Sequence, residues 1–284
     1  MISTRFAPAP TGHLHLGHVV NALYVWETAR REGGRVLLRI EDHDRQRSRP
    51  EYEASILEDL EWLGFVPDAP LVRQSDRTAI YNAALDRLRD AGLVYACECS
   101  RRDIVDAGGS GAELRYPGTC SSKGLAETAD RAIRVRLSRS EESFEDLLAG
   151  PQHQIPADQC GDLLARDRHG NWTYQFAVTV DDYDQGIDLV IRGMDLLQST
   201  GRQIQLARLL GRPTPPRFMH HALVMSTPEQ KLSKSDGASG IRELRARGLS
   251  AEDVKAEAKQ AISLGPSSQL PASSSEHERR RADS

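Results

Sequence analysis

Two short polar motifs carry residue types that suit phosphate chemistry. The first, HLHLGH at residues 13–18, follows the run RFAPAPTG, and the second, KLSKS at residues 231–235, lies far downstream. Imidazole N–H groups stabilise phosphate oxygens whose negative charge grows in a transition state, so His15 and His18 are candidate catalytic residues. Taken alone, each motif has an alternative interpretation as an ordinary surface turn or loop.

The elements around the first motif place it where a nucleotide can bind. STRFAP predicts a short strand ended by Pro8 and Pro10, and apolar residues at helical spacing predict a helix over residues 16–32. The amino end of such a helix collects unpaired N–H groups and partial positive charge, which attract phosphate. Because Gly17 has no side chain, a base or ribose can approach the backbone closely there.

The rest of the chain predicts a doubly wound α/β fold with an inserted segment. RVLLRIED is an apolar strand typical of a buried parallel sheet, and AIRVRL is a second strand in a less regular region. Helices are expected at residues 51–63, 77–91, 196–210, 241–247 and 251–263. We expect five segments: the first half of the catalytic domain at 1–94, a cysteine-bearing insertion at 95–165, the second half at 166–225, a loop and helical segment at 226–265, and a disordered tail at 266–284.

Composition narrows the classes of function. The 284-residue chain is 39% apolar and 27% charged with a net charge of −4, which argues against a protein that coats nucleic acid. Any RNA must then be held locally, by arginines such as Arg131, Arg134, Arg136 and Arg139. No run reaches the ~18 apolar residues of a membrane span, and no signal pattern opens the chain, so we expect a cytoplasmic protein without a membrane partner.

Together, the two motifs resemble the two signatures of the class I aminoacyl-tRNA synthetases. HLGH at residues 15–18 matches the HIGH-type tetrapeptide after the first strand, and KLSKS matches the KMSKS-type loop after the last strand. The resemblance implies a Rossmann-type domain that uses ATP with Mg²⁺ to form an aminoacyl-adenylate, and a catalytic Lys234 that neutralises the triphosphate. The ATP-binding residues that it implies are His15, Gly17, His18, Lys231 and Lys234.

The segment TRFAPAPTGHLHLGH, followed by LLRIEDHDRQRS, resembles the glutamyl branch of that class. Ala9 stands where the branch carries Ser and His43 where it carries Thr, and the lost hydroxyl at residue 9 removes one substrate hydrogen bond. An acidic amino acid needs cations for its carboxylates and an anion for its ammonium, which suits Arg5 and Glu41.

Two later segments, WTYQFAVTVDD and IRGMDLL, resemble the remaining pocket segments of the branch. They imply that the Tyr174 hydroxyl donates to glutamate and that Arg192 supplies a second cationic contact. The full set of glutamate-binding residues implied by the resemblance is Arg5, Phe6, Ala7, Pro8, Ala9, Glu41, Tyr174 and Arg192.

The chain stops soon after the KLSKS loop, whereas glutamyl-tRNA synthetases continue into helical domains that read the anticodon. In this it resembles the short paralogues of the family, the glutamyl-queuosine tRNA(Asp) synthetases. They imply activation of L-glutamate without tRNA, then transfer to the queuosine base at the wobble position of tRNA(Asp), here by a monomer. The alternatives are a truncated glutamyl-tRNA synthetase charging tRNA(Glu), a non-catalytic tRNA-binding derivative and a nucleotidyltransferase for another small acid.

Three of the four cysteines form a pattern with metal-site spacing. Cys97, Cys99 and Cys120 lie on two short segments and offer three thiolates, most of a tetrahedral Zn²⁺ site. The short paralogues carry a similar Cys-x-Cys and Tyr-x3-Cys arrangement, which implies Tyr116 as fourth ligand of one structural Zn²⁺. Two alternatives remain: Tyr116 lies outside the first coordination sphere, or the cysteines are simply buried. Cys160 is interpreted as a core residue.

Overall fold

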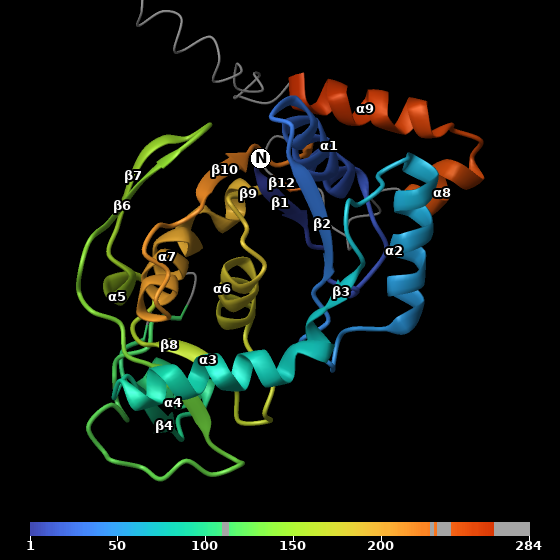
Figure 1. The fold of residues 1–284 in the computed structure, drawn as a ribbon. Coiled ribbons are helices and arrows are strands. Elements are labelled where there is room, and N and C mark those ends of the chain that lie inside the picture. The colour runs from blue at the N-terminus through green and yellow to red at the C-terminus, as the bar shows by residue number, and fades with distance from the viewer. Residues whose placement is uncertain (110–113, 228–229, 232–239, 264–284) are drawn as a thin grey trace, which may run out of the picture.

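The protein is described by a computed structural model over residues 1–109, 114–227, 230–231 and 240–263 (Figure 1). Its N-terminal part alternates parallel strands with helices: β1 (Ser3–Phe6), α1 (Leu16–Arg31), β2 (Arg35–Ile40), α2 (Pro50–Leu63) and β3 (Val72–Arg73). Strand β2 pairs in parallel with both β1 and β3. Parallel neighbours need crossover connections, which α1 and α2 provide, and both helices confirm the sequence prediction.

Helix α3 links these strands to a separate antiparallel sheet. The 3-10 helix η1 (Gln74–Arg77) leads into α3 (Thr78–Asp90), which runs across the bottom of the view in Figure 1. Beyond it the strands pair in the order β4–β5–β8, and a short helix follows the first strand. The bounds are β4 (Val94–Cys97), α4 (Arg101–Asp106), β5 (Ala132–Val135) and β8 (Leu163–Arg166).

The other strands build a four-stranded sheet in the order β7–β6–β10–β9. Strand β10 (Arg217–His221) pairs in parallel with β9 (Leu189–Gly193) on one side and with β6 (Glu142–Asp146) on the other. Strand β6 forms an antiparallel hairpin with β7 (Gly150–Gln154) at the edge of the sheet. The short helix α5 (Pro156–Gln159) follows the hairpin. The range 95–165 therefore holds two parts: the β4–β5–β8 sheet, and a hairpin that joins the sheet of the second half.

Helices and short strands complete the second half. Their bounds are α6 (Tyr174–Asp184), η2 (Met194–Ser199), α7 (Thr200–Leu209), β11 (Met225–Thr227), β12 (Gln230–Lys231), α8 (Ile241–Ala246) and α9 (Ala251–Ser263). The helix predicted over 196–210 is wrong at its start, because the chain leaves β9 through the 3-10 turn of η2 and becomes α-helical only at Thr200. Helix α9 packs on α1 (Figure 1).

The two largest of the four apolar clusters among the described residues form most of the core. The first packs α1, α2 and the C-terminal helices against β1, β2 and β9, with Val25, Val36 and Ile191 fully buried. The second joins α3 to β5, β8, α6 and α7, and half-buried Cys160 packs against it. Each such aliphatic side chain contributes about 1.5–3 kcal/mol by leaving water. Among the described residues no helix is long and apolar enough to cross a membrane, and the tail predicted at 266–284 lies outside them.

The four arginines expected to hold RNA do not form one exposed patch. Strand β5 is the central strand of its sheet, so Arg134 is buried, with its guanidinium 3.6 Å above the ring of Tyr116. Arg136 lies over an aromatic ring as well, and Arg139 forms an ion pair with Asp158. The central position of β5 therefore buries Arg134, while Arg136 is half-buried and lies just after the strand, so a contact of these arginines with RNA stays a prediction.

Candidate active site

A cavity of about 460 Å³ opens where β1 and β9 end. Ligands of parallel α/β sheets bind at the carboxyl ends of strands, and this cavity occupies that position. Its walls bring together all of the predicted glutamate and nucleotide residues whose side chains the structure describes: Arg5, Phe6, Ala7, Pro8, Ala9, His15, Gly17, His18, Glu41, Tyr174 and Arg192. The Lys231 side chain and Lys234 lie outside the described residues.

The histidine motif forms the amino-terminal cap of α1. The Gly17 N–H donates to His15 Nδ1 at 3.1 Å, and the His15 N–H donates to His18 Nδ1 at 3.1 Å. Because each Nδ1 accepts, a neutral ring carries its hydrogen on Nε2, which is the donor form that a phosphate needs. The two rings lie 3.9 Å apart, and a Cβ at Gly17 would lie 3.0 Å from the His15 ring.

Arg5 is fixed by a carboxylate that the sequence analysis missed. Its Nε and Nη2 donate to Asp182 at 3.0 and 3.3 Å, and its Nη1 donates to the Ile191 carbonyl at 3.3 Å. These bonds use three of its five N–H groups and hold the guanidinium at the cavity wall. The acidic run VDDYD in α6 was visible in the sequence, but nothing local connects it to a residue of β1.

Beneath Arg5 lies a buried charge network that includes Glu41. Arg39, with no exposed side-chain surface, contacts Asp182 at 2.9 Å and Glu41 at 3.3 Å. Burial alone would raise the pKa of Asp182, but the guanidinium groups of Arg5 and Arg39 hold it below its usual value. Burial raises the pKa of Glu41, and a bound ammonium group would favour its ionised form.

Arg192 is held by three neutral partners. Its Nε donates to His220 Nε2 at 2.9 Å, its Nη1 to Gln203 Oε1 at 2.7 Å and its Nη2 to Thr200 Oγ1 at 2.8 Å. Asp146 Oδ2 lies 2.6 Å from His220 Nδ1, so the imidazole presents Nε2 as an acceptor. Burial lowers the pKa of His220, which keeps it neutral beside the cation.

None of these three hydrogen bonds goes to a carboxylate, so the partners do not neutralise the positive charge of Arg192. Burial lowers the pKa of Arg192, and it raises the pKa of Tyr174, whose hydroxyl therefore remains a donor. A buried guanidinium with neutral partners favours an anionic ligand. The side chains that hold it come from β6, α7 and β10, and the sequence carried no signal for that convergence.

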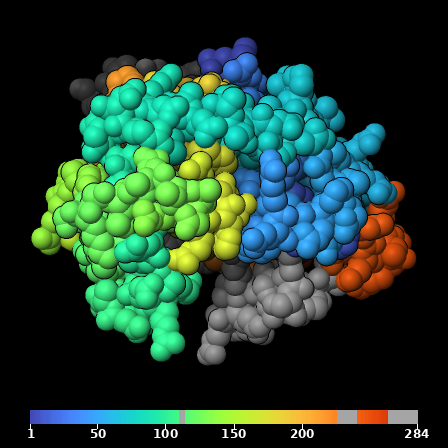
Figure 2. Space-filling model, turned by 90° about the horizontal axis from the view of Figure 1, so that it is seen from below, coloured from blue at the N-terminus to red at the C-terminus, as the bar shows by residue number. Residues whose placement is uncertain are grey.

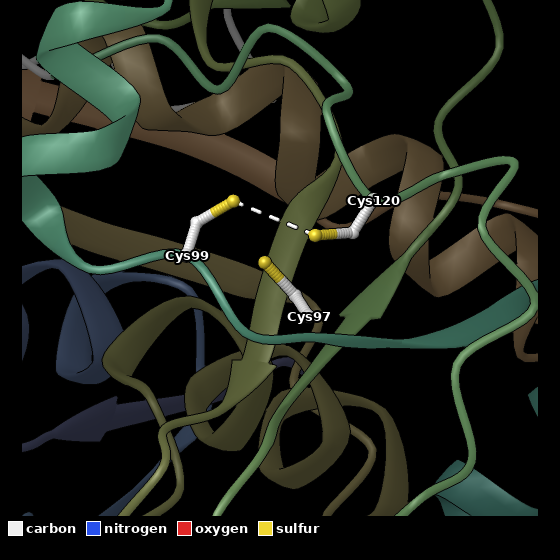
Figure 3. A group of neighbouring side chains, drawn as sticks. All are labelled: Cys97, Cys99 and Cys120. Carbon is white, nitrogen blue, oxygen red and sulfur yellow. Dashed lines mark hydrogen bonds between the residues drawn. The ribbon is translucent and has the colours of Figure 1, made fainter.

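The predicted metal residues also come together. The sulfur atoms of Cys97, Cys99 and Cys120 all lie within 4.8 Å of one another and point toward a common centre (Figure 3). Cys97 ends β4, Cys99 follows it, and Cys120 comes from the loop before β5. Tyr116 is buried, and its hydroxyl accepts from the Cys120 N–H at 2.8 Å and lies 3.4 Å from Cys97 Sγ.

Two of these distances are close to those between neighbouring ligands of a tetrahedral zinc ion. With Zn–S near 2.3 Å and Zn–O near 2.0 Å, neighbouring ligands stand roughly 3.8 Å apart for two sulfurs and roughly 3.5 Å for sulfur and oxygen. The structure has 3.5 Å between Cys99 Sγ and Cys120 Sγ and 3.4 Å between Cys97 Sγ and the Tyr116 oxygen. The donor set is therefore suitable for a metal, and Cys160 lies outside it.

Comparisons with known proteins agree with this geometry. The family model described as tRNA synthetases class I (E and Q), catalytic domain, matches residues 1–254. The chain belongs to that family. The fold class predicted from the sequence, a class I synthetase domain with a parallel sheet, is confirmed, and membership in the class implies that ATP is used.

Individual relatives indicate which class I synthetases this chain resembles. A glutamyl-Q tRNA(Asp) synthetase of Rhodobacter capsulatus is 42% identical over 275 residues, covering 89% of this chain and 98% of the relative. One from Burkholderia cenocepacia is 46% identical over 244 residues, covering 84% and 81%. A glutamate tRNA ligase of Elizabethkingia meningosepticum, solved with its amino acid, superposes with a TM-score of 0.72 at 30% identity. The match covers 87% of this chain but 53% of that ligase, about half of its length.

Proposed function

We propose that this chain activates L-glutamate with ATP and Mg²⁺ without tRNA, then transfers it to the queuosine base at the wobble position of tRNA(Asp). The observation that carries the proposal is Arg192, a buried cation held by neutral groups. It lines the same cavity as His15 and His18, the histidines at the amino-terminal cap of α1. It suits the side-chain carboxylate of glutamate. The likeness to glutamyl-Q tRNA(Asp) synthetases supports the acceptor.

The first step joins glutamate to ATP. Arg192 and the Tyr174 hydroxyl bind the side-chain carboxylate, Arg5 lies across the pocket, and Glu41 accepts hydrogen bonds from the α-ammonium group. An oxygen of the α-carboxylate forms a bond to the α-phosphorus while the bond from that phosphorus to the β-phosphate oxygen breaks, releasing pyrophosphate. The Nε2–H groups of His15 and His18 stabilise the phosphate charge as it grows.

Lys234 and Lys231 act in the same step. We assign Lys234 to the departing pyrophosphate and Lys231 to ATP binding, on the match of KLSKS to the family's loop. In the second step a queuosine hydroxyl attacks the activated carbonyl carbon. The hydroxyl loses its proton, an ester bond forms and AMP departs.

We propose one structural Zn²⁺ held by Cys97, Cys99, Cys120 and Tyr116. The ion would tie the loop that carries Cys120 to the end of β4, in a part of the chain with a small apolar cluster of its own. The ion would contribute no chemistry to adenylation, because none of its four proposed ligands lines the cavity of the candidate active site.

A second candidate function is the charging of tRNA(Glu). The 30% identity to a glutamate tRNA ligase favours it, since the glutamate site is common to both functions. The relatives from Rhodobacter capsulatus and Burkholderia cenocepacia match over most of their own length and are glutamyl-Q tRNA(Asp) synthetases, which favours the first proposal.

The experiment measures activation and acceptance separately. We expect ATP–pyrophosphate exchange that depends on L-glutamate and needs no tRNA. We then expect labelled glutamate on tRNA(Asp) with queuosine, and none on tRNA(Asp) without queuosine or on tRNA(Glu). Exchange without transfer to any tRNA would contradict the proposal that queuosine-bearing tRNA(Asp) is the acceptor. Labelled tRNA(Glu) would favour the second candidate function.

A further inference from the structure

A second cavity, of about 480 Å³, lies between the cysteine cluster and the candidate active site. Cys99 and Ile104 line it on one side and Tyr174 and Gln175 on the other. Its volume falls in the range of about 300–1,000 Å³ that ligand pockets occupy. In the view from below, the segment that leads into α6 (yellow) lies between the insertion (green) and the N-terminal part (blue) (Figure 2).

The charge of this cavity is positive. Four arginines line it, Arg101, Arg134, Arg168 and Arg202, against two aspartates. Both aspartates already accept local hydrogen bonds: Asp162 from the Tyr95 hydroxyl and the Leu137 N–H, and Asp167 from the side chain and backbone of Asn171. The excess of cations therefore favours an anionic ligand.

The four arginines differ in solvent exposure from the rim of the cavity to its floor. Arg101 and Arg168 are exposed, whereas Arg134 and Arg202 are 7% and 6% exposed. Arg134 donates from Nη1 to the Asp162 carbonyl, but its buried Nε has no hydrogen-bond partner among the described residues. A buried N–H without a partner loses free energy, which a ligand with an acceptor atom in this cavity would restore.

Tyr174 lines both cavities, so they share a wall. A nucleoside in the second cavity would lie beside the place where the glutamyl-adenylate forms. A second binding step must bring the acceptor hydroxyl to the activated carbonyl, and the shared wall meets that need.

We propose that the second cavity receives the acceptor nucleoside of an RNA strand, with the flanking phosphates on Arg101 and Arg168. This inference rests on the proposed function and names the surface that the RNA uses. Proteins read single-stranded loops by taking splayed bases into pockets while cations hold the phosphates. The exposed arginines at the rim suit phosphates, and the enclosed floor suits a base with polar edges.

The test removes the two rim charges together. Arg101→Ala with Arg168→Ala should leave glutamate-dependent pyrophosphate exchange unchanged and raise the KM for a queuosine-bearing anticodon stem-loop about tenfold or more. Each phosphate contact to a single strand contributes about 0.7 to the salt slope, so the slope should fall by about 1.4. Arg102→Ala is the matched control, because Arg102 lies on the same helix and outside the cavity. The pair Arg101→Lys and Arg168→Lys, which keeps the charges, should recover most of the affinity.

The outcomes separate this inference from the proposed function. A double alanine variant with the KM and salt slope of the wild type would overturn the cavity assignment while the function stands. An equal loss in the Arg102→Ala control, or a loss of pyrophosphate exchange, would also overturn it. If the wild type fails to transfer glutamate, fluorescence anisotropy with the same stem-loop still decides: weaker binding by the double variant alone supports the cavity, and equal binding overturns it.

Discussion

The two cavities share a wall but hold their arginines differently. In the cavity of the candidate active site, Arg5 and Arg192 are each 4% exposed and fixed by several hydrogen bonds. At the second cavity Arg101 and Arg168 are exposed, and Arg168 donates one hydrogen bond, to the Glu98 carbonyl. A small charged substrate gains from groups that are already oriented, because little side-chain entropy is lost on binding. A large polyanion instead meets cations that can adjust. The difference suits the proposed roles, a small charged substrate in the first cavity and an RNA strand in the second.

The same contrast predicts how much binding each cavity loses when one of its arginines is replaced. Removing a fixed, buried cation leaves its partners and its ligand without compensation, so the loss is steep. Removing an exposed cation costs less and depends on ionic strength. The predictions below are ordered by the size of the effect that this contrast implies.

The largest effect is expected from Arg192→Leu. The variant should lose glutamate activation by more than about a hundredfold, since truncating one partner of a buried charge pair typically costs about 2–5 kcal/mol. ATP binding should change little, because the histidine motif lies on another element. Pyrophosphate exchange at low glutamate measures it, with Arg139→Leu, an exposed arginine, as control. More than about a tenth of wild-type exchange would remove Arg192 from the substrate site.

The next effect concerns Lys234, which we assign to the transition state on the match of KLSKS to the family's loop. Lys234→Ala should lower kcat for adenylate formation by about a hundredfold and weaken ATP binding much less, because its charge acts on the departing pyrophosphate. Pre-steady-state adenylate formation and equilibrium ATP binding give the two quantities. A proportional loss in both would make Lys234 a simple binding residue.

A smaller effect is expected when the support of Arg192 is removed. His220→Leu takes away the acceptor of the Arg192 Nε–H and should raise the KM for glutamate about tenfold, with kcat and the KM for ATP less affected. His220→Gln offers an amide oxygen to Arg192 and should recover part of the loss. If both variants raise the two KM values equally, His220 is a residue of the fold and not a positioning residue.

The pH profile tests the same contact. Burial lowers the pKa of His220 from 6.5, so the folded protein keeps the ring neutral and the hydrogen bond from Arg192 intact at pH 6.5 and above. As the pH falls through the lowered pKa, the ring gains a proton, Nε2 stops accepting and the KM for glutamate should rise. The His220→Gln variant should lack this rise.

Local patterns predicted the main helices and half of the residues that line the cavity of the candidate active site. Apolar spacing predicted α1, a charged helical pattern predicted α9, and family motifs predicted Arg5, Glu41, Tyr174 and Arg192. The support around them could not be predicted, because Asp146 and His220 are 74 residues apart and meet only when β6 pairs with β10. The buried state of Arg134 was missed for the same reason, since a strand's place in its sheet is a long-range property.

Removal of the metal should affect the second cavity more than the candidate active site. Purified protein should contain about one zinc per chain, and Cys120→Ser should lose it, since three thiolates cannot be reduced to two without weakening the site. Loss of the ion should loosen the wall of the second cavity that Cys99 forms. Transfer to tRNA should then fall several-fold more than pyrophosphate exchange. Cys160→Ser is the control for zinc content only, because Cys160 lies outside the cluster but lines the second cavity. Equal losses in transfer and exchange would contradict the separation.

The smallest effect is expected from Tyr116→Phe, which removes one oxygen from the cysteine cluster. The Tyr116 hydroxyl oxygen lies 3.4 Å from Cys97 Sγ, a distance that fits two neighbouring ligands of one zinc ion. The variant should therefore release zinc to a chelator roughly tenfold faster than the wild type. Tyr95→Phe is the matched control, because that buried hydroxyl donates to Asp162 and not to the cluster. Unchanged release would make the Tyr116 hydroxyl a hydrogen-bond partner of Cys97 and the Cys120 N–H, with another group completing the metal site. Even then the three thiolates would remain the stronger part of the site, since sulfur ligands dominate structural zinc sites.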